Sequence, residues 1–228
     1  MFVSKKLLGK IPAITILSTT AIGDHSVDLI PGKYEFTIMA GGGAGTCGYS
    51  IRTGTYSGMA QGGVGGTITL VASVSSDITI VAHVGGPGSG HGSHDFSATG
   101  AGWTAGSGEP SYITDGTNNA FVCEGGTGAS FYADSNSSGV GTLGVAGSTS
   151  SESNIPQISL IRIVKNSADN PIVGGTSAQY LRNTYAPAIG KVIDPVNGGI
   201  YQPGSASGNG GRTGINGIKG GIIIKRLP

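Results

Sequence analysis

Short runs of branched apolar residues recur along this chain, and most of them alternate with polar positions as β-strands do. In residues 33–39 the side chains of Tyr34, Phe36 and Ile38 fall on one face, and polar side chains fall on the other. The other runs that predict strands are residues 11–17, 67–74, 78–84, 155–164 and 222–224. We therefore predict an all-β fold in which Tyr34, Phe36 and Ile38 share one face of a strand.

Turn residues separate these runs. Pro31-Gly32 precedes the strand at 33–39, and Ser75-Ser76-Asp77 joins residues 67–74 to residues 78–84. Two alternating runs joined by so short a turn predict an antiparallel hairpin. No helix is predicted, because the best candidate, residues 177–184, spans barely two turns.

Glycine fills much of the sequence between the strands, at 44 of 228 residues. It clusters at residues 41–45 and 62–66 and recurs at short, irregular intervals from 85 to 147. Glycine loses more conformational freedom on folding than any other residue, so this chain is either a disordered tract or a packed array of extended segments. A hydrophobic content of 37% with only 11% charged residues favours the packed array, because disordered chains are poor in apolar residues.

We predict that residues 85–147 form a bundle of glycine-rich polyproline II (polyglycine II) helices. A polyproline II helix has no internal hydrogen bonds, so its N–H and C=O groups must bond laterally to neighbouring helices, and glycine lets those neighbours approach closely. The chain is then a single domain. Its parts are an N-terminal strand and attachment segment (1–30), β-strands with glycine loops (31–84), the polyproline II region (85–147) and closing strands and loops (148–228).

The low charge of the chain limits the classes of partner that can be expected. The net charge is +1 and no basic run is longer than Lys5-Lys6, so neither nucleic acid nor an anionic membrane is an expected partner. No apolar run is long enough for membrane insertion.

Cys47 and Cys123 match no metal-ligand or redox spacing, and whether they pair stays open. The first twenty residues lack a clean cleavage site, so no signal peptide is predicted. This combination suits a virion component that is released by host lysis.

The order of these pieces resembles known glycine-rich families. The stretches that carry the resemblance are IPGKYEFTIMAGGGAG (30–45), GGVGGTITLVASVSSDITIVAHVGGPG (62–88) and GINGIKGGIIIKR (214–226). They are similar to the glycine-rich domains of bacteriophage tail-fibre adhesins and related virion proteins, and to the glycine-rich region of anaplastic lymphoma kinase-type receptors. Residues 148–197 match neither family, and no glycine run exceeds three residues.

The two resemblances have different implications. The receptor resemblance implies a jelly-roll-like β-sandwich in which packed polyglycine II helices replace strand connections. The phage resemblance implies a tail-fibre tip adhesin on the surface of the phage particle, with a rigid glycine core and variable loops that contact a host cell-surface protein or glycan.

Aromatic side chains in glycine-rich loops are the candidates for receptor contact. Loops on a rigid scaffold often carry binding residues, and aromatic rings supply contact area at low entropic cost. The candidates are Tyr49, Tyr56, Trp103, Tyr112, Phe131 and Tyr132. The alternative is that each of them caps an end of the glycine bundle.

An adhesin also needs a point of attachment to its particle. The segment with Lys5, Lys6, Leu7 and Leu8 is the natural candidate for that contact. Equally, these residues could simply begin the sandwich.

Residues that could carry chemistry are few. His91, His94 and Asp95 are the only cluster of metal-ligand types, but a loop histidine pair without a third strong partner is more often solvated, so no metal or cofactor is predicted. The carboxylates in the glycine-rich region show no glycosidase-type pairing. They are Asp95, Asp115, Glu124 and Asp134. With no Gly-x-Ser-x-Gly elbow, no Walker loop, and no helix after residues 41–45, we do not predict an enzyme.

Three classes of function remain. The first is the tail-fibre adhesin, and the second is a capsid or tail decoration protein that uses the same fold for assembly with other virion proteins. The third is an ice-binding protein, which ranks last because the glycine spacing is too irregular for a lattice-matching face. Irregular aromatic loops favour recognition, while branched strands at 11–17 and 222–224, expected to be exposed, favour docking onto a neighbouring subunit. A single copy and a homotrimer both stay open.

Overall fold

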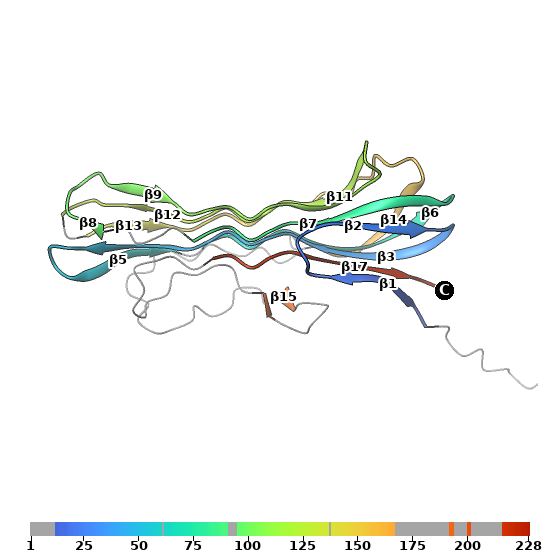
Figure 1. Ribbon diagram of the computed structural model, residues 1–228, viewed down its shortest axis with the longest axis horizontal. Helices are drawn as coiled ribbons and strands as arrows, with labels where there is room; N and C mark the ends of the chain where they lie inside the picture. Colours follow the sequence, from blue (N-terminus) through green and yellow to red (C-terminus); the bar gives the residue numbers. More distant parts are fainter. Residues whose placement is uncertain are drawn as a thin grey trace, which may run out of the picture.

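The structure is a computed structural model that describes residues 12–60, 62–90, 95–136, 138–166, 192–193, 200–201 and 216–228. Every regular element in these ranges is a β-strand, so the all-β prediction is confirmed. Figure 1 shows an elongated molecule with a β-sandwich at one end and a group of short strands at the other. Among the described residues, no helix is long and apolar enough to cross a membrane.

The sandwich consists of two antiparallel sheets. The larger has the strand order β1-β17-β3-β6-β14, with β1 at Ile14–Thr19, β17 at Gly221–Arg226, β3 at Gly32–Met39, β6 at Thr67–Val74 and β14 at Ile158–Asn166. The smaller has the order β11-β10-β7-β2, with β11 at Asn119–Cys123, β10 at Ser111–Thr114, β7 at Ile78–Val84 and β2 at Gly23–Leu29. Their apolar faces enclose a single core.

The predicted faces of β3 are confirmed. Tyr34, Phe36 and Ile38 are buried in the core, because alternate residues of a strand share one face of its sheet. Phe36 contacts Phe121 of the opposite sheet, with ring centroids 5.4 Å apart. Side-chain burial therefore holds the two sheets together.

The predicted hairpin between β6 and β7 is wrong. The two strands belong to different sheets: β6 pairs with β3 and β14, whereas β7 pairs with β2 and β10. The turn at 75–77 therefore crosses from one sheet to the other. This arch lets the apolar faces of both strands meet the same core, and strand periodicity alone does not distinguish it from a hairpin.

The predicted exposure of residues 222–224 is also wrong. β17 lies inside its sheet, between β1 and β3, so Ile222, Ile223 and Ile224 are all buried. The other strand expected to be exposed begins at Ile14, and there Ile14 and Ile16 do lie on the surface, at the sheet edge.

Glycine-rich segments run between the two ends of the molecule and form the bundle. They are residues 40–45, 62–66, 85–90, 105–110, 124–129, 143–148 and 216–220. Most of them join a strand of the sandwich to a strand at the far end, so they lie side by side in Figure 1. The bundle thus includes segments outside the predicted region 85–147, and that region itself also contains short strands.

Hydrogen bonds from the central segment, 40–45, repeat every three residues. The N–H groups of Ala40 and Gly43 donate to the carbonyl oxygens of Gly66 and Gly63, at 2.9 and 2.8 Å. The N–H groups one residue further along, at 41 and 44, bond instead to a different neighbour, residues 105–110. A three-residue period of lateral bonds is what polyproline II helices in a bundle produce. The lateral hydrogen bonds that we predicted to compensate for glycine's loss of conformational entropy are therefore present.

Close approach explains why the bundle needs glycine. A Cβ placed on Gly43 would lie 2.0 Å from the carbonyl oxygen of Thr127, and one on Gly126 would lie 2.0 Å from that of Gly63. Backbone atoms cannot yield as a flexible side chain can. Gly42 differs, because the nearest atom to its added Cβ would be 3.5 Å away, in ordinary contact.

Candidate functional site

The end of the molecule furthest from the sandwich is built from two small sheets, which together we call the tip (Figure 1). One sheet has the order β5-β4-β8, with β5 at Thr55–Ala60, β4 at Thr46–Ser50 and β8 at Asp95–Phe96. The other has the order β13-β12-β9, with β13 at Val140–Thr142, β12 at Ser130–Tyr132 and β9 at Gly102–Thr104. A separate two-stranded pair, β15 (Val192–Ile193) and β16 (Ile200–Tyr201), completes the described strands.

Phe131 is the centre of the tip. Its ring stacks on Trp103 at a centroid distance of 4.2 Å and contacts Phe96 at 5.3 Å. Glycine makes room for the ring on both sides, since a Cβ on Gly48 or Gly139 would lie 2.4 or 2.3 Å from it. Phe131 is only 3% exposed, so this predicted contact residue holds the tip together from inside.

Trp103 is also part of this packing. It is half-buried, and its indole N–H donates a hydrogen bond of 2.7 Å to Oγ1 of Thr46 on β4. This bond joins the two small sheets. The packing of Phe131 and Trp103 therefore favours the alternative interpretation, in which each aromatic residue caps an end of the bundle.

Tyrosines occupy different parts of the molecule. Tyr49 and Tyr56 are cross-strand partners on β4 and β5, and the side chain of Tyr56 lies outside the described part of the structure. Tyr132 is 54% exposed on the tip. Tyr112 is at the other end, on β10, where its ring stacks on His83 at 4.7 Å. Tyr112 therefore cannot act with the tip residues. The predicted position in a loop is wrong for all six aromatic candidates, because each of them lies on a strand.

The outer face of the sheet β13-β12-β9 presents two rows of side chains. Because Phe131 points inward, its neighbours Ser130 and Tyr132 point outward. Tyr132 lies opposite Val140 on one side and Gly102 on the other. Ser130 lies in the same way between Thr142 and Thr104.

This outer face is uncharged and open. Its residues are Gly102, Thr104, Ser130, Tyr132, Val140 and Thr142. Within the part of the chain that the structure describes, the hydroxyls of Thr104, Ser130 and Thr142 have no hydrogen-bond partner. Sequence reasoning identified Tyr132 but missed the other members, because strands of three residues are too short to reveal which cross-strand partners share a face.

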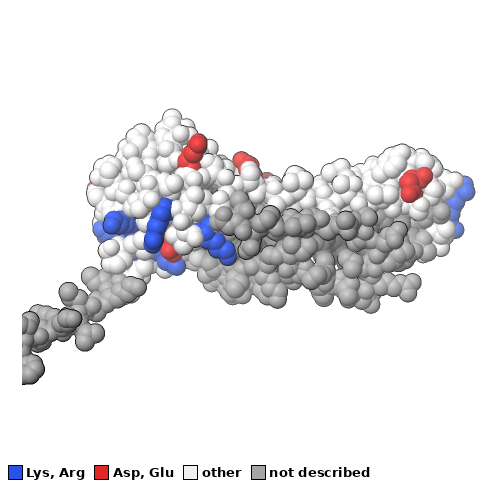
Figure 2. Space-filling view, turned by 180° about the vertical axis from the view of Figure 1, so that it is seen from behind, with Lys and Arg blue, Asp and Glu red and all other residues white. Residues whose placement is uncertain are grey.

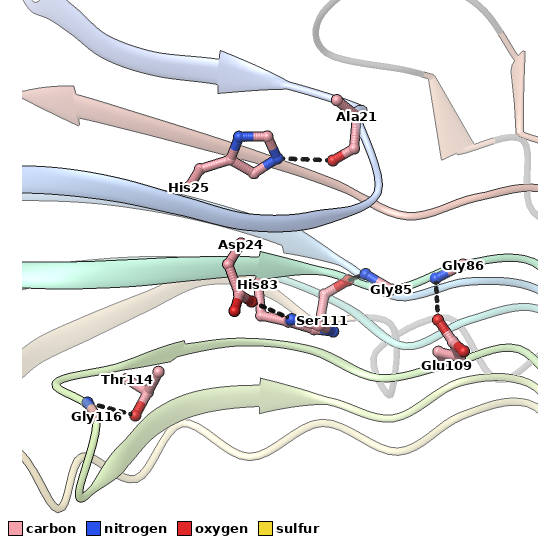
Figure 3. Close-up of polar contacts among 10 residues, drawn as sticks. All are labelled: Ala21, Asp24, His25, His83, Gly85, Gly86, Glu109, Ser111, Thr114 and Gly116. Carbon is pink, nitrogen blue, oxygen red and sulfur yellow. Dashed lines mark hydrogen bonds and ion pairs between the residues drawn. The ribbon is translucent and has the colours of Figure 1, made fainter.

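Polar side chains stabilise the junction between the bundle and the sandwich, as Figure 3 shows. The buried hydroxyl of Ser111 accepts a hydrogen bond of 2.9 Å from the N–H of Gly85, and the carboxylate of Glu109 accepts one of 2.8 Å from that of Gly86. These are the first two N–H groups after β7. They are therefore bonded where the strand ladder ends and the bundle begins.

An aspartate–histidine pair lies on the outer surface of the smaller sandwich sheet. Nδ1 of His83 is 2.5 Å from Oδ1 of Asp24, its cross-strand neighbour (Figure 3). On its other side the His83 ring stacks on Tyr112. The partners follow directly from strand register. The side chains of Asp24, His83 and Tyr112 thus contact one another across neighbouring strands on the surface, and this packing explains their positions.

Of the predicted metal-ligand cluster, His91 and His94 lie outside the described residues, and Asp95 is exposed on β8. Within the described ranges, no group of three or more His, Cys, Asp or Glu side chains could hold a metal ion.

The predicted carboxylates serve local structure in two cases. Asp115 accepts hydrogen bonds from the N–H groups of Asn118 and Thr117, at 2.6 and 2.8 Å, which hold its pKa below the ordinary value. Asp134 accepts a bond of 2.5 Å from the Ser138 hydroxyl in the turn after β12. Glu124 begins the bundle segment 124–129, where its N–H donates to the carbonyl of residue 148.

Cys123 is a free, buried thiol. Its Sγ donates to the carbonyl oxygen of Ile38 at 3.4 Å, and burial raises its pKa far above the usual range. The thiol therefore stays protonated and unreactive in the folded protein. The side chain of Cys47, like the attachment candidates Lys5, Lys6, Leu7 and Leu8, lies outside the described part of the structure.

Figure 2 shows that charged side chains are unevenly spread on the face in view. Lys and Arg gather over the sandwich end, while the described surface towards the tip is mostly uncharged. Comparison with known proteins adds no assignment: no family model matches this chain, and no curated protein is significantly similar to it.

Proposed function

We propose that this protein is a structural component of a bacteriophage particle that acts as a tail-fibre tip adhesin. The tip would contact a receptor on the host cell surface, and the sandwich would join the rest of the fibre. No catalytic step is part of this function.

The observation that carries the proposal is the separation of the two ends by the bundle. β1 and β17, the first and the last of the described strands, both lie in the sandwich. The tip is held away from it by segments locked to one another through backbone hydrogen bonds. A rigid spacer with a small, sparsely charged, partly aromatic end is the form that a contact module on a fibre needs.

A second candidate, a capsid or tail decoration protein, is favoured by apolar side chains on the edges of the larger sandwich sheet. The exposed residues are Ile14 and Ile16 on β1, and Leu160, Ile161, Ile163 and Val164 on β14. Exposed apolar edge strands invite pairing with another chain. In a decoration protein these edges, rather than the tip, would be the functional surface.

Blocking each end in turn tests the proposal. In a Cys47→Ser background, one variant carries Arg52→Cys in the tip turn after β4, and its matched control carries Asp77→Cys in the turn between β6 and β7. Both positions are exposed turn residues. Each cysteine is coupled to a bulky polyethylene glycol, and the fluorescently labelled full chain is titrated onto a panel of bacterial strains.

The expected result is saturable binding to at least one strain that is lost with polymer at position 52 and retained with polymer at 77. Binding that is blocked only from position 77 would contradict a role for the tip. No saturable binding to any strain, together with tight association of the full chain with phage particles blocked from position 77, would favour the decoration protein.

A further inference from the structure

We propose that the outer face of the sheet β13-β12-β9 is a binding site for the sugar units of an uncharged cell-surface glycan. This inference rests on the proposed function, because it names the chemical class of the receptor. The site is the pair of outward rows centred on Tyr132 and Ser130.

Tyr132 gives this face an aromatic platform. Its ring is 54% exposed, and its neighbour on β9 is Gly102, which has no side chain to cover it. A Cβ on Gly102 would lie 3.6 Å from the Tyr132 ring, so the ring edge already lies over the glycine. The C–H groups on one face of a sugar ring pack well on such an open aromatic surface.

The second row supplies hydrogen-bonding groups beside the platform. Ser130 lies two residues before Tyr132 on the same strand, so the rows are about 7 Å apart, and strands are about 5 Å apart. The row places three hydroxyls, those of Thr104, Ser130 and Thr142, side by side across the sheet. A sugar stacked on Tyr132 would bring its own hydroxyls within reach of this row.

The state of these hydroxyls is a second, independent observation. In the described part of the tip, several other hydroxyls are bonded to their neighbours: that of Ser50 donates to the carbonyl oxygen of Asn136, and that of Ser138 donates to Asp134. Those of Thr104, Ser130 and Thr142 have no partner among the described residues, and they lie at or near the surface. Hydroxyls that can both donate and accept match the hydroxyls of a sugar.

Because the outer face carries no charged side chain, the expected glycan is an uncharged one. The two rows contain no Lys, Arg or His, so the face gains nothing from the carboxylates or phosphates of an acidic polymer. A protein partner is the weaker reading, because hot spots in protein interfaces are rich in Trp, Tyr and Arg but poor in Ser, Thr and Val, which fill four of the six positions here. Here one tyrosine and one valine lie beside a row of three hydroxyls.

The test uses a bacterial strain to which the labelled full chain binds saturably. One sample of cells is treated with periodate, which cleaves the vicinal diols of sugars, and another with protease, which removes exposed surface proteins. Binding should fall by about tenfold or more after periodate and stay within about twofold after protease, relative to mock-treated cells.

Variants then place the site on this face. Tyr132→Ala should weaken binding about tenfold, and the double variant Thr104→Val, Thr142→Val should weaken it by a similar factor, because it removes two hydroxyls and keeps the side-chain shape. Ile51→Ala is the matched control, since Ile51 is also 54% exposed on the tip but lies in the turn after β4. Fluorescence of Trp103, the only tryptophan, reports whether each variant keeps a folded tip.

The outcomes separate this inference from the proposed function. Binding that survives periodate but is lost after protease overturns the glycan and leaves the adhesin. Periodate-sensitive binding that Tyr132→Ala leaves unchanged, in a folded tip, overturns this face as the site. Absence of saturable binding to every strain counts against the adhesin itself.

Discussion

The sandwich and the glycine bundle are ordered by opposite means within one chain. In the sandwich, large side chains such as Phe36 and Phe121 are fully buried between two sheets. In the bundle, backbone N–H groups bond to carbonyl oxygens of neighbouring segments, and glycine lets those segments approach closely. The first core gains mainly from removing apolar surface from water, and the second from lateral hydrogen bonds and close backbone contact.

This difference predicts opposite sensitivities to mutation. A side-chain core is damaged by removing atoms, because a cavity remains. A backbone core is damaged by adding atoms, because a carbonyl oxygen already fills the space where a Cβ would go. The variants below test that contrast.

The largest expected effect is that of Phe36→Ala in the sandwich. It removes a fully buried ring that contacts Tyr34 and Phe121, so the free energy of unfolding should fall by about 3–5 kcal/mol. Urea unfolding followed by circular dichroism measures the loss. In a Cys47→Ser background, the buried Cys123 thiol should also react with a thiol reagent at lower urea concentration. A loss under about 1 kcal/mol would mean that side-chain burial does not limit stability here.

The next largest effect is expected from Gly43→Ala in the bundle. The new Cβ would meet the carbonyl oxygen of Thr127 at 2.0 Å, which forces two segments apart, so the free energy of unfolding should fall by about 1–3 kcal/mol. Gly42→Ala is the matched control in the same segment, with its nearest atom at 3.5 Å. It should be neutral or stabilise by up to about 1 kcal/mol, because alanine restricts the unfolded chain.

Urea unfolding of the two glycine variants side by side measures this difference. Equal destabilisation by both would show that loss of glycine flexibility, rather than the close approach of segments, limits the bundle. Equal tolerance of both would show that the segments can separate without cost.

The smallest expected effect is the response of Asp115 to acid. The pKa of Asp115 is lowered in the folded protein, so its contribution to stability is present above the ordinary value of 3.8 and is lost as pH falls through the lowered folded value. The urea midpoint should therefore decline between about pH 5 and pH 2, and Asp115→Asn should show a shallower decline. The peptide groups that join the bundle do not titrate there. An identical pH profile for the variant would contradict the role of this turn.

Much of the sandwich could be predicted from local pattern. The strands at 33–39, 67–74 and 78–84 and the buried face of β3 follow from two-residue alternation, which depends only on nearby residues. Strand partners could not be predicted. The arch between β6 and β7 and the interior place of β17 depend on which surfaces meet the core.

Phe121 illustrates how the fold overrides local preference. Its φ is 53°, in the left-handed region that a bulky residue rarely adopts. The strain coincides with a register shift, in which β11 has one residue more than its partner β10 between paired positions. The extra residue turns the Phe121 ring into the core opposite Phe36. No local sequence signal marks this position.

The tip was the least predictable part. Its aromatic residues were recognisable as candidates, but the sequence could not tell the buried Phe131 from the exposed Tyr132 beside it. That choice depends on glycine at positions 48 and 139, far apart in the sequence, where only the absence of a Cβ admits the Phe131 ring.

By itself, the sequence determined that this protein is all-β and that glycine must be packed by lateral backbone bonds, because alternation and composition act locally. Only the tertiary structure decided which segments join the bundle, which strands share a sheet and which side chains face outward at the tip. Those choices depend on contacts between residues far apart in the chain, where the position of one carbonyl oxygen decides whether a neighbour may carry a Cβ.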